Sequence, residues 1–399
     1  MGTVAPDSRL PSLTGLRFLA ALGVFGFHVN VLGLFGERHA AAAVALVFGP
    51  GSNGVSFFFI LSGFVLTWSA RPGAAALDIW RRRAAKIFPN HLVTWLIGIA
   101  ALAYTSHAVP LINTLPGFVL LQAWIPDPDV YYAANTPAWS LSCEAAFYAA
   151  FPLLLRAITR VREARLWPLA GLLVGGVLLL PLAARALPDE LAHWFVYIFP
   201  MTRALEFAVG IVLARIVGAK RWIRLGLWPA IGIFVSVYAV SATIPGDYTY
   251  VARMVIPFAM IIPAAALADL TGHRTGLRGR TFQWLGEISF AFYLAHQLVM
   301  RLVDKTFGDF PRATPAALAI TLLMLALSLI AADLLHRLVE RPVMHHLTTP
   351  RRVPLAPEPA RHPAVSVPNA ARKAGAMGRS RSGKASTRPS TWLPFSTRR

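Results

Sequence analysis

Residues 166–184 read LWPLAGLLVGGVLLLPLAA, and no side chain in this stretch carries a formal charge. A helix that crosses a bilayer needs about 20 consecutive, mostly apolar residues. The stretch therefore predicts a membrane-spanning helix near residues 166–187. Similar apolar runs with short breaks recur from Leu13 to about Leu338. The sequence predicts an all-α fold, a polytopic membrane protein that forms a bundle of about ten transmembrane helices.

The composition of the chain agrees with lipid as its solvent. Of the 399 residues, 56% are hydrophobic and 14% are charged, whereas soluble domains carry about 25% charged residues. A shorter apolar run, 111–125, contains Pro116 and is expected to be interfacial or re-entrant. The first span is long enough to cross and others follow, so we interpret it as a retained helix and not as a signal peptide. Spans are expected near residues 13–34, 53–70, 87–106, 141–157, 166–187, 193–217, 226–244, 250–270, 284–303 and 314–338.

Lys and Arg are concentrated in alternate loops between these spans. The loops between them are poor in Lys and Arg and contain acidic residues, which include Asp247 and Asp309. Cytoplasmic loops of membrane proteins carry an excess of Lys and Arg. The alternation therefore predicts that both termini lie in the cytoplasm. The four basic loops are 71–86, which begins with Arg71, 156–165, 215–224 and 271–283.

The chain divides into three predicted parts. These are a short cytoplasmic N-terminus (1–12), a transmembrane domain (13–345) and a disordered basic cytoplasmic tail (346–399). The formal net charge is +20, but no nucleic-acid motif accompanies it, so we expect a membrane lipid partner and no nucleic acid. The lone cysteine, Cys143, excludes an internal disulfide and zinc-type spacing, and we expect it to be inert and packed.

Two ionisable residues in the first span form the strongest functional signal. Arg17 and His28 are eleven residues apart, which is about three helical turns, so both lie on one stripe and roughly 16 Å apart along the axis. Ionisable side chains inside spans usually face a cavity or a partner. We expect Arg17 near the cytoplasmic mouth of a water-accessible channel and His28 deeper in it, where an imidazole can accept a proton.

Further polar residues have both a structural and a functional interpretation. The basic residues before Pro89 fit either topology and lipid headgroups or a phosphate clamp. Glu144 fits either helix-dipole stabilisation or a role beside His28. Arg203 and Glu206 are three residues apart and predict an intrahelical ion pair. Structural polar contacts are expected for His336, Glu340 and Arg341, whereas Tyr293 and His296, also three apart, stay open between structure and function.

Taken together, six motifs in this order resemble the acyltransferase family 3. Members of that family are integral-membrane O-acyltransferases that modify bacterial surface glycans, lipopolysaccharide, peptidoglycan or macrolide antibiotics. The resemblance covers about residues 10–345, and it implies the stand-alone type without an extra periplasmic domain, in the bacterial inner membrane. The motifs are Leu13-Thr14-Gly15-Leu16-Arg17 with His28, the segment Ser52–Gly63, the basic stretch ending in Pro89, Trp139-Ser140-Leu141-Ser142 with Glu144, Ser289-Phe290 through His296, and Glu340-Arg341-Pro342.

The resemblance implies a donor, an acceptor and a set of site residues. The donor is acyl-CoA, with acetyl-CoA the common one, and the acceptor is a hydroxyl of a glycan, glycolipid or glycosylated metabolite. His28 is the implied catalytic base, aided by Glu144, and no metal is expected. We expect Arg17, Arg82, Arg83 and Lys86 to bind the donor, and Trp139, Tyr293 and His296 to bind substrate. The chain departs from the usual family pattern at Ser56, Lys86 and His91, where Asp, Arg and Tyr are usual.

Two other functions use the same residues. A proton-coupled transporter or flippase would employ the buried charges as a proton relay, although the chain has no evident internal repeat, which many transporters show. A scaffold without catalysis would leave His28 packed with no cavity beside it. Acyl transfer that depends on a thioester donor would distinguish the enzyme from both.

Overall fold

The structure is a computed structural model that describes residues 9–70, 73, 75–105, 110–241, 251–308 and 310–348. Most of the predicted N-terminal part, nearly all of the predicted tail, and Arg71, Asp247 and Asp309 lie outside the described residues.

The described residues are helical, and they contain no strand apart from one isolated bridge between Phe35 and Arg312. The all-α prediction is confirmed. The helices are α1 (Pro11–Leu32), α2 (Arg38–Phe48), α3 (Gly54–Ser69), α4 (Ala76–Thr105), α5 (Leu111–Phe118), α6 (Pro128–Tyr131), α7 (Trp139–Thr159), α8 (Leu166–Ala184), α9 (Asp189–His193), α10 (Pro200–Gly218), α11 (Leu227–Ser241), α12 (Ala252–Leu270), α13 (Arg280–Phe307), α14 (Thr314–Leu335) and α15 (Arg341–Thr348).

Each of the ten predicted spans overlaps one of these helices. Eight helical segments of the described chain are long and apolar enough to cross a membrane. The other two predicted spans are α11, which has 15 described residues, and α13, whose polar residues such as His296 and Gln297 lower its mean hydropathy. The run 111–125 forms only the short helix α5 and one turn at Gln122–Trp124.

One predicted boundary is wrong. The sequence placed residues 71–86 in a loop before a span that begins near residue 87, but α4 begins at Ala76 and continues through Pro89. The stretch Trp80–Lys86 is rich in Arg, Ala and Lys, which have high helix propensity. The basic residues therefore project from a helix in fixed directions, and this decides which of them face the interior of the bundle.

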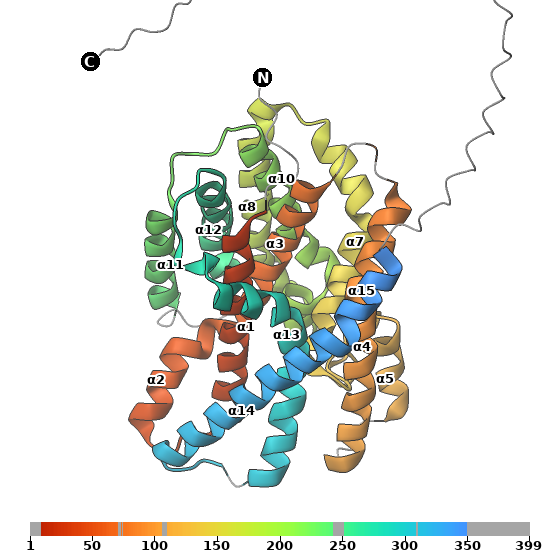
Figure 1. Cartoon of the computed structure of the whole chain (residues 1–399), viewed down its shortest axis with the longest axis vertical. Coiled ribbons are helices and arrows are strands. Elements are labelled where there is room, and N and C mark those ends of the chain that lie inside the picture. Colours follow the sequence, from red (N-terminus) through yellow and green to blue (C-terminus); the bar gives the residue numbers. More distant parts are fainter. Residues whose placement is uncertain are drawn as a thin grey trace, which may run out of the picture. The chain divides into compact units, whose positions relative to one another are not determined.

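Helix α1 packs against several other spanning helices (Figure 1). It contacts α13, α3 and α12, of which α12 and α13 are far away in the sequence. Its approach to α13 is close at Gly286, where a Cβ atom would lie 2.1 Å from the Thr14 carbonyl oxygen. The α3–α10 pair is equally tight, since a Cβ on Gly210 would lie 1.9 Å from the Ile60 oxygen. Small residues let helix backbones approach closely in membranes, and here they fix the helix positions.

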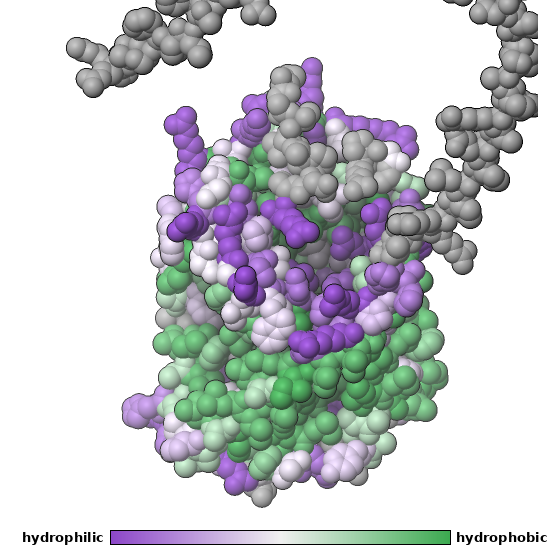
Figure 2. Space-filling view, in the orientation of Figure 1, coloured by the Kyte–Doolittle hydropathy of each residue, from purple (hydrophilic) through white to green (hydrophobic). Residues whose placement is uncertain are grey.

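The surface is divided by polarity (Figure 2). Apolar residues form a broad band around the lower part of the visible face, and hydrophilic residues gather above it, at the end where α1 begins. Exposed apolar side chains of the spanning helices, such as Leu153, Leu172 and Leu338, are each more than 70% exposed. An apolar surface this exposed is unfavourable in water and is stabilised in a bilayer.

Candidate active site

A cavity of about 130 Å³ lies among α1, α3, α4, α7 and α13. Its charged lining residues are Arg17 of α1, Arg83 and Lys86 of α4 and Glu144 of α7. The structure thus brings together four of the predicted site residues, and Tyr293 of α13 is a fifth. Other polar groups on the wall come from Ser62, Ser140 and Tyr148.

Glu144 is held by two hydroxyl groups inside this cavity. Ser62 Oγ donates a hydrogen bond to Glu144 Oε1 at 3.3 Å, and Tyr148 Oη donates to Oε2 at 3.1 Å. Arg17 lies close enough to Glu144 for electrostatic attraction. The guanidinium of Arg83 lies over the Tyr148 ring, 5.5 Å from its centroid. A buried carboxylate needs such partners to offset its desolvation, so Glu144 belongs to the cationic cavity and does not pair with His28.

Lys86 forms an ion pair with an acidic residue that follows α14. Its ammonium forms an ion pair with Glu340, in the π-helical segment η8 (His336–Glu340) that follows α14. Asn90 Nδ2 also donates to Glu340 Oε2 at 2.7 Å, and His336 Nδ1 lies 3.3 Å from Oε1. Glu340 is only 2% exposed. The pair neutralises Lys86, so the cavity keeps two further cations, Arg17 and Arg83, against one carboxylate, Glu144, and its net charge is positive.

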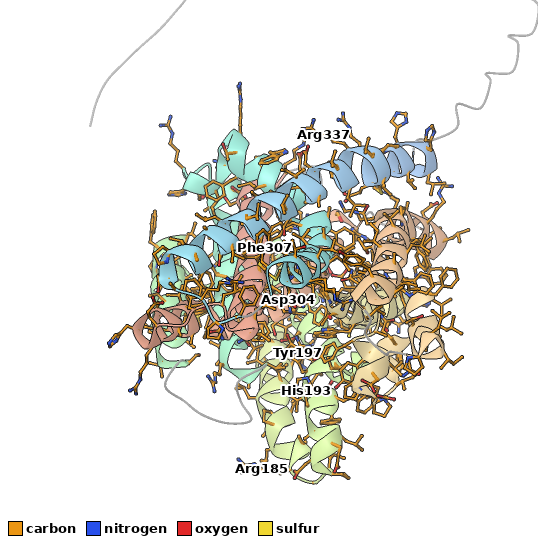
Figure 3. The ribbon with its side chains drawn as sticks, turned by 90° about the horizontal axis from the view of Figure 1, so that it is seen from below. Arg185, His193, Tyr197, Asp304, Phe307 and Arg337 are labelled. Atoms are coloured by element: carbon orange, nitrogen blue, oxygen red, sulfur yellow. The ribbon has the colours of Figure 1, made fainter. Side chains whose placement is uncertain are left out.

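His28 is paired with His296, outside the cavity. Nδ1 of His28 lies 2.9 Å from Nε2 of His296, and the ring centroids are 5.0 Å apart. His296 is fully buried on α13, whereas His28 is half-buried on α1. Seen from below, Asp304 and Phe307 near the end of α13 lie between Arg337, after α14, and Tyr197 (Figure 3). His296 is buried because α13 packs against α1, α14 and α4.

The cavity at Arg17 does not extend to His28, so it is not the continuous channel that we expected. Tyr293 lines the cavity, and its ring lies 6.0 Å from the His296 ring and 5.8 Å from the Phe58 ring, measured between centroids. Tyr293 Oη is also hydrogen bonded to Ser140 Oγ at 2.9 Å. The aromatic side chains of Tyr293 and Phe58 therefore form the wall on the side of the histidine pair.

Two predicted site residues belong neither to the cavity lining nor to the histidine pair. Arg82 is exposed, and its Nε donates to the Asp78 carbonyl oxygen at 3.2 Å. Successive side chains on a helix are rotated by about 100°, so Arg82 does not point in the same direction as Arg83. Trp139 is buried against Tyr197, with ring centroids 4.8 Å apart, and does not line the cavity.

Two other predictions from the sequence are confirmed. Arg203 and Glu206 form the predicted intrahelical ion pair, at 3.2 Å and without exposed side-chain surface. The Arg203 guanidinium also donates to Ser56 Oγ at 3.1 Å. Cys143 is buried, and its Sγ donates to the Ile198 carbonyl oxygen at 3.2 Å, in agreement with a packed thiol.

Tyr148, Ser62 and Phe58 were not predicted as site residues. Tyr148 follows Glu144 by four positions on the same helix, and residues at this spacing are neighbours on a helix surface, so its place beside Glu144 was available from the sequence. Ser62 and Phe58 come from α3, and no local pattern indicates that α3 faces α7 and α13 here.

A second, larger cavity lies between α1, α11 and α12. It has a volume of about 830 Å³ and is lined mostly by apolar side chains, among them Leu19, Phe57 and Phe258. None of the predicted site residues lines it. Its wall on α1 includes Leu16 and Ala20, one helix face away from Arg17 and His28.

Comparisons with known proteins show which family the chain resembles. A family model described as an acyltransferase domain matches residues 10–335. The chain is 40% identical to the acyltransferase MdmB of Streptomyces mycarofaciens over 88% of this chain and 96% of that protein. It is 26% identical to the exopolysaccharide production protein ExoZ of Rhizobium meliloti, over 77% of this chain and 93% of that protein. It is 23% identical to the peptidoglycan O-acetyltransferase OatA of Listeria monocytogenes, over 84% of this chain and 56% of that protein. No solved structure matches the chain.

Proposed function

Because the chain belongs to the acyltransferase family 3 and is a membrane-embedded acyltransferase, we propose that it moves an acyl group from acyl-CoA to a hydroxyl. Acetyl is the expected group, and a glycan, glycolipid or glycosylated metabolite is the expected acceptor. The names of OatA and ExoZ support O-acetyl transfer and a glycan acceptor. The observation that carries the proposal is the cationic cavity at Arg17 and Arg83, one aromatic wall away from a pair of imidazoles.

The size of the cavity indicates how much of the donor it can hold. Pockets for drug-sized ligands measure about 300–1,000 Å³, and this cavity has about 130 Å³. It therefore accommodates only the thioester end of acyl-CoA. The phosphates of the donor would remain at the mouth, where Arg83 and the exposed Arg82 supply positive charge and where Arg binds phosphate bidentately. Lys86 is neutralised by Glu340, so its role is to line the cavity and connect α4 to the segment after α14.

The transfer step uses His28 as a general base. The imidazole takes the proton of the acceptor hydroxyl while the hydroxyl oxygen forms a bond to the thioester carbonyl carbon. The carbon–sulfur bond then breaks, and the leaving thiolate takes the proton from His28. General-base catalysis of this kind contributes about 10² to 10⁴ in rate. Glu144 acts at the donor end, where it orients the guanidinium groups of Arg17 and Arg83.

The wall between the donor cavity and the base must open for this step. Tyr293 and Phe58 lie in that wall. Rotation of these two side chains would join the cavity to His28 without movement of a whole helix. In this mechanism the donor enters from the cytoplasmic side, and the wall protects the thioester from water until the acceptor is in place.

The proposed location follows from the charge of the loops. The protein would lie in the bacterial inner membrane with both termini in the cytoplasm, and residues 13–345 would form the catalytic domain. The basic loops would then face cytosolic acyl-CoA.

The experiment that tests the function compares cells with and without the gene. Mass spectrometry of surface glycans and secreted metabolites should reveal one class of molecule that loses an acyl group in the deletion strain. Complementation with His28→Ala should lower the amount of acylated product by about 10² or more, because the general base is absent. Gln297→Leu serves as the control from the same region of the bundle and should restore the product.

Transfer should also be followed in membranes of the deletion strain with [¹⁴C]acetyl-CoA as the donor. Label should appear on the acceptor with the wild-type protein and not with His28→Ala. If His28→Ala transfers label at the wild-type rate, His28 is not the base. If the acceptor crosses the membrane but never gains label, the protein is a transporter or flippase and the proposal is wrong.

A further inference from the structure

The donor and acceptor in each hydrogen bond of the two histidines can be assigned in sequence, starting from the Phe292 carbonyl oxygen that His296 contacts. Nδ1 of His296 lies 3.2 Å from the Phe292 carbonyl oxygen, four residues earlier on α13. A carbonyl oxygen only accepts, so this nitrogen of His296 must carry a proton. In a neutral imidazole the other nitrogen is then an acceptor.

A neutral His296 is the favourable form at this place. The side chain is 0% exposed. Of the ion pairs formed by the described residues, none involves His28 or His296. Burying a cation without a carboxylate partner is costly. His296 therefore has a protonated Nδ1 and a free lone pair on Nε2, and Nε2 is the atom that faces His28.

The same reasoning then determines His28. Its Nδ1 lies 2.9 Å from His296 Nε2, which can only accept, so Nδ1 of His28 must be the donor in this contact. The His28 ring also has a hydrogen bond with the Val24 backbone, one turn earlier on α1. The proton of a neutral His28 thus sits on Nδ1, and Nε2 of His28 is left unprotonated. His28 is half-buried and therefore partly accessible, whereas His296 is not. The arrangement leaves the basic nitrogen of the accessible ring unprotonated.

We propose that His296 is a positioning residue that holds His28 in the tautomer with the proton on Nδ1, so that Nε2 is the base. This inference rests on the proposed function of His28. In the Ser-His-Asp triad a buried carboxylate performs the same task for the catalytic imidazole. Here a neutral imidazole, itself oriented by the Phe292 carbonyl, replaces the carboxylate. No net negative charge has to be buried in the membrane for this purpose.

The arrangement also has a consequence for the charged state of His28. When Nε2 accepts the proton of the hydroxyl, Nδ1–H still donates to His296, and the hydrogen bond becomes charge-assisted and stronger. His296 keeps its own proton throughout, because the Phe292 oxygen cannot accept it covalently. The pair therefore orients and stabilises the imidazolium without a second proton transfer.

The first test measures the tautomer directly and does not require activity. The protein is labelled with [¹⁵N]histidine, reconstituted in nanodiscs and studied by ¹⁵N NMR, with the His28 signals assigned by their loss in His28→Ala. We expect a protonated Nδ1 and an unprotonated Nε2 in the wild type. The Nε2–H form should appear in His296→Leu. A wild-type His28 with its proton on Nε2 would overturn the proposal.

The second test uses two substitutions that differ only in their ability to accept a hydrogen bond. His296→Gln offers an amide oxygen to Nδ1–H of His28, whereas His296→Leu offers none. With [¹⁴C]acetyl-CoA and membranes that contain the native acceptor, His296→Leu should lower kcat by about 10²-fold or more, since a wrong tautomer costs about 10⁴ in a serine protease. The KM for acetyl-CoA should change little, because His296 does not line the donor cavity.

The matched variants separate positioning from packing. His296→Gln should keep kcat within about tenfold of the wild type, and Gln297→Leu, one position along α13, should keep wild-type kcat. Equal losses in His296→Gln and His296→Leu would indicate a structural role and reject the proposal. Absence of transfer in the wild type itself would reject the proposed function, while the NMR result would still decide the tautomer.

Discussion

At the scale of single residues, Glu340 shows how a buried charge changes the role of its neighbours. Its carboxylate accepts hydrogen bonds from Lys86 and Asn90 of α4 and lies beside His336. From its position in the basic stretch, Lys86 is expected to bind the donor together with the nearby arginines. The structure instead gives Lys86 a neutralising partner 254 residues away. The contact fixes the segment after α14 to α4.

Loss of this carboxylate should destabilise the protein. Removal of one partner of a buried ion pair costs about 3–5 kcal/mol, and Lys86 is 27% exposed, so we expect about 3 kcal/mol for Glu340→Gln, near the low end. The measurement is the free energy of unfolding in detergent micelles. A double-mutant cycle with Lys86→Met should recover part of the loss, because the ammonium no longer lacks a partner. Additive losses in the cycle would contradict a direct interaction.

At the scale of helices, the distance between α1 and α13 controls the histidine pair. Both helices carry one member of the pair, and they meet closely where Gly286 packs against the backbone of Thr14. Gly286 and His296 are ten residues apart on α13, so a shift of α13 at Gly286 also moves the imidazole. Gly286 has no side chain that could take part in the chemistry, but it contributes to the geometry of the site through this close approach.

Gly286→Ala should therefore affect both stability and activity. A Cβ at this position would lie 2.1 Å from the Thr14 oxygen, which the backbones can relieve only by separating. We expect a loss of about 1–3 kcal/mol from overpacking and a fall in acyl transfer, measured as thermal unfolding in nanodiscs and as [¹⁴C]acetyl transfer. Gly175→Ala on α8 is the control, because nothing lies within 4 Å of its Cβ. Full activity in Gly286→Ala would show that the close approach does not position His28.

At the scale of the whole chain, the arrangement across the membrane can be tested with single cysteines. Wild-type Cys143 is buried and should not react with a membrane-impermeant thiol reagent. Glu190 on α9 and Arg160 after α7 are both exposed. In spheroplasts, Glu190→Cys should react at once and Arg160→Cys only after permeabilisation, because the basic loops are proposed to face the cytoplasm. The reverse pattern would invert the topology and remove cytosolic acyl-CoA as the donor.

Local features of the chain were predicted well because they depend on neighbours in sequence. Apolar runs gave the ten helical segments, and the spacing of Arg203 and Glu206 gave their ion pair. The boundary predicted at residue 87 was wrong because the residues before it have high helix propensity, so α4 begins at Ala76. The sequence also did not reveal that Arg82 lies outside the cavity lining, since the direction of its side chain was decided only once residues 76–86 were known to be helical.

The sequence by itself determined that this chain is a helical membrane protein with the motifs of its family, since hydrophobic length and residue spacing are properties of one segment at a time. Only the tertiary structure decided that His28 pairs with His296, 268 residues away, and that Glu144 joins the cationic cavity. The physical reason is that one helix offers several faces, and packing against α4, α7 and α13 selects which polar groups can satisfy one another away from water.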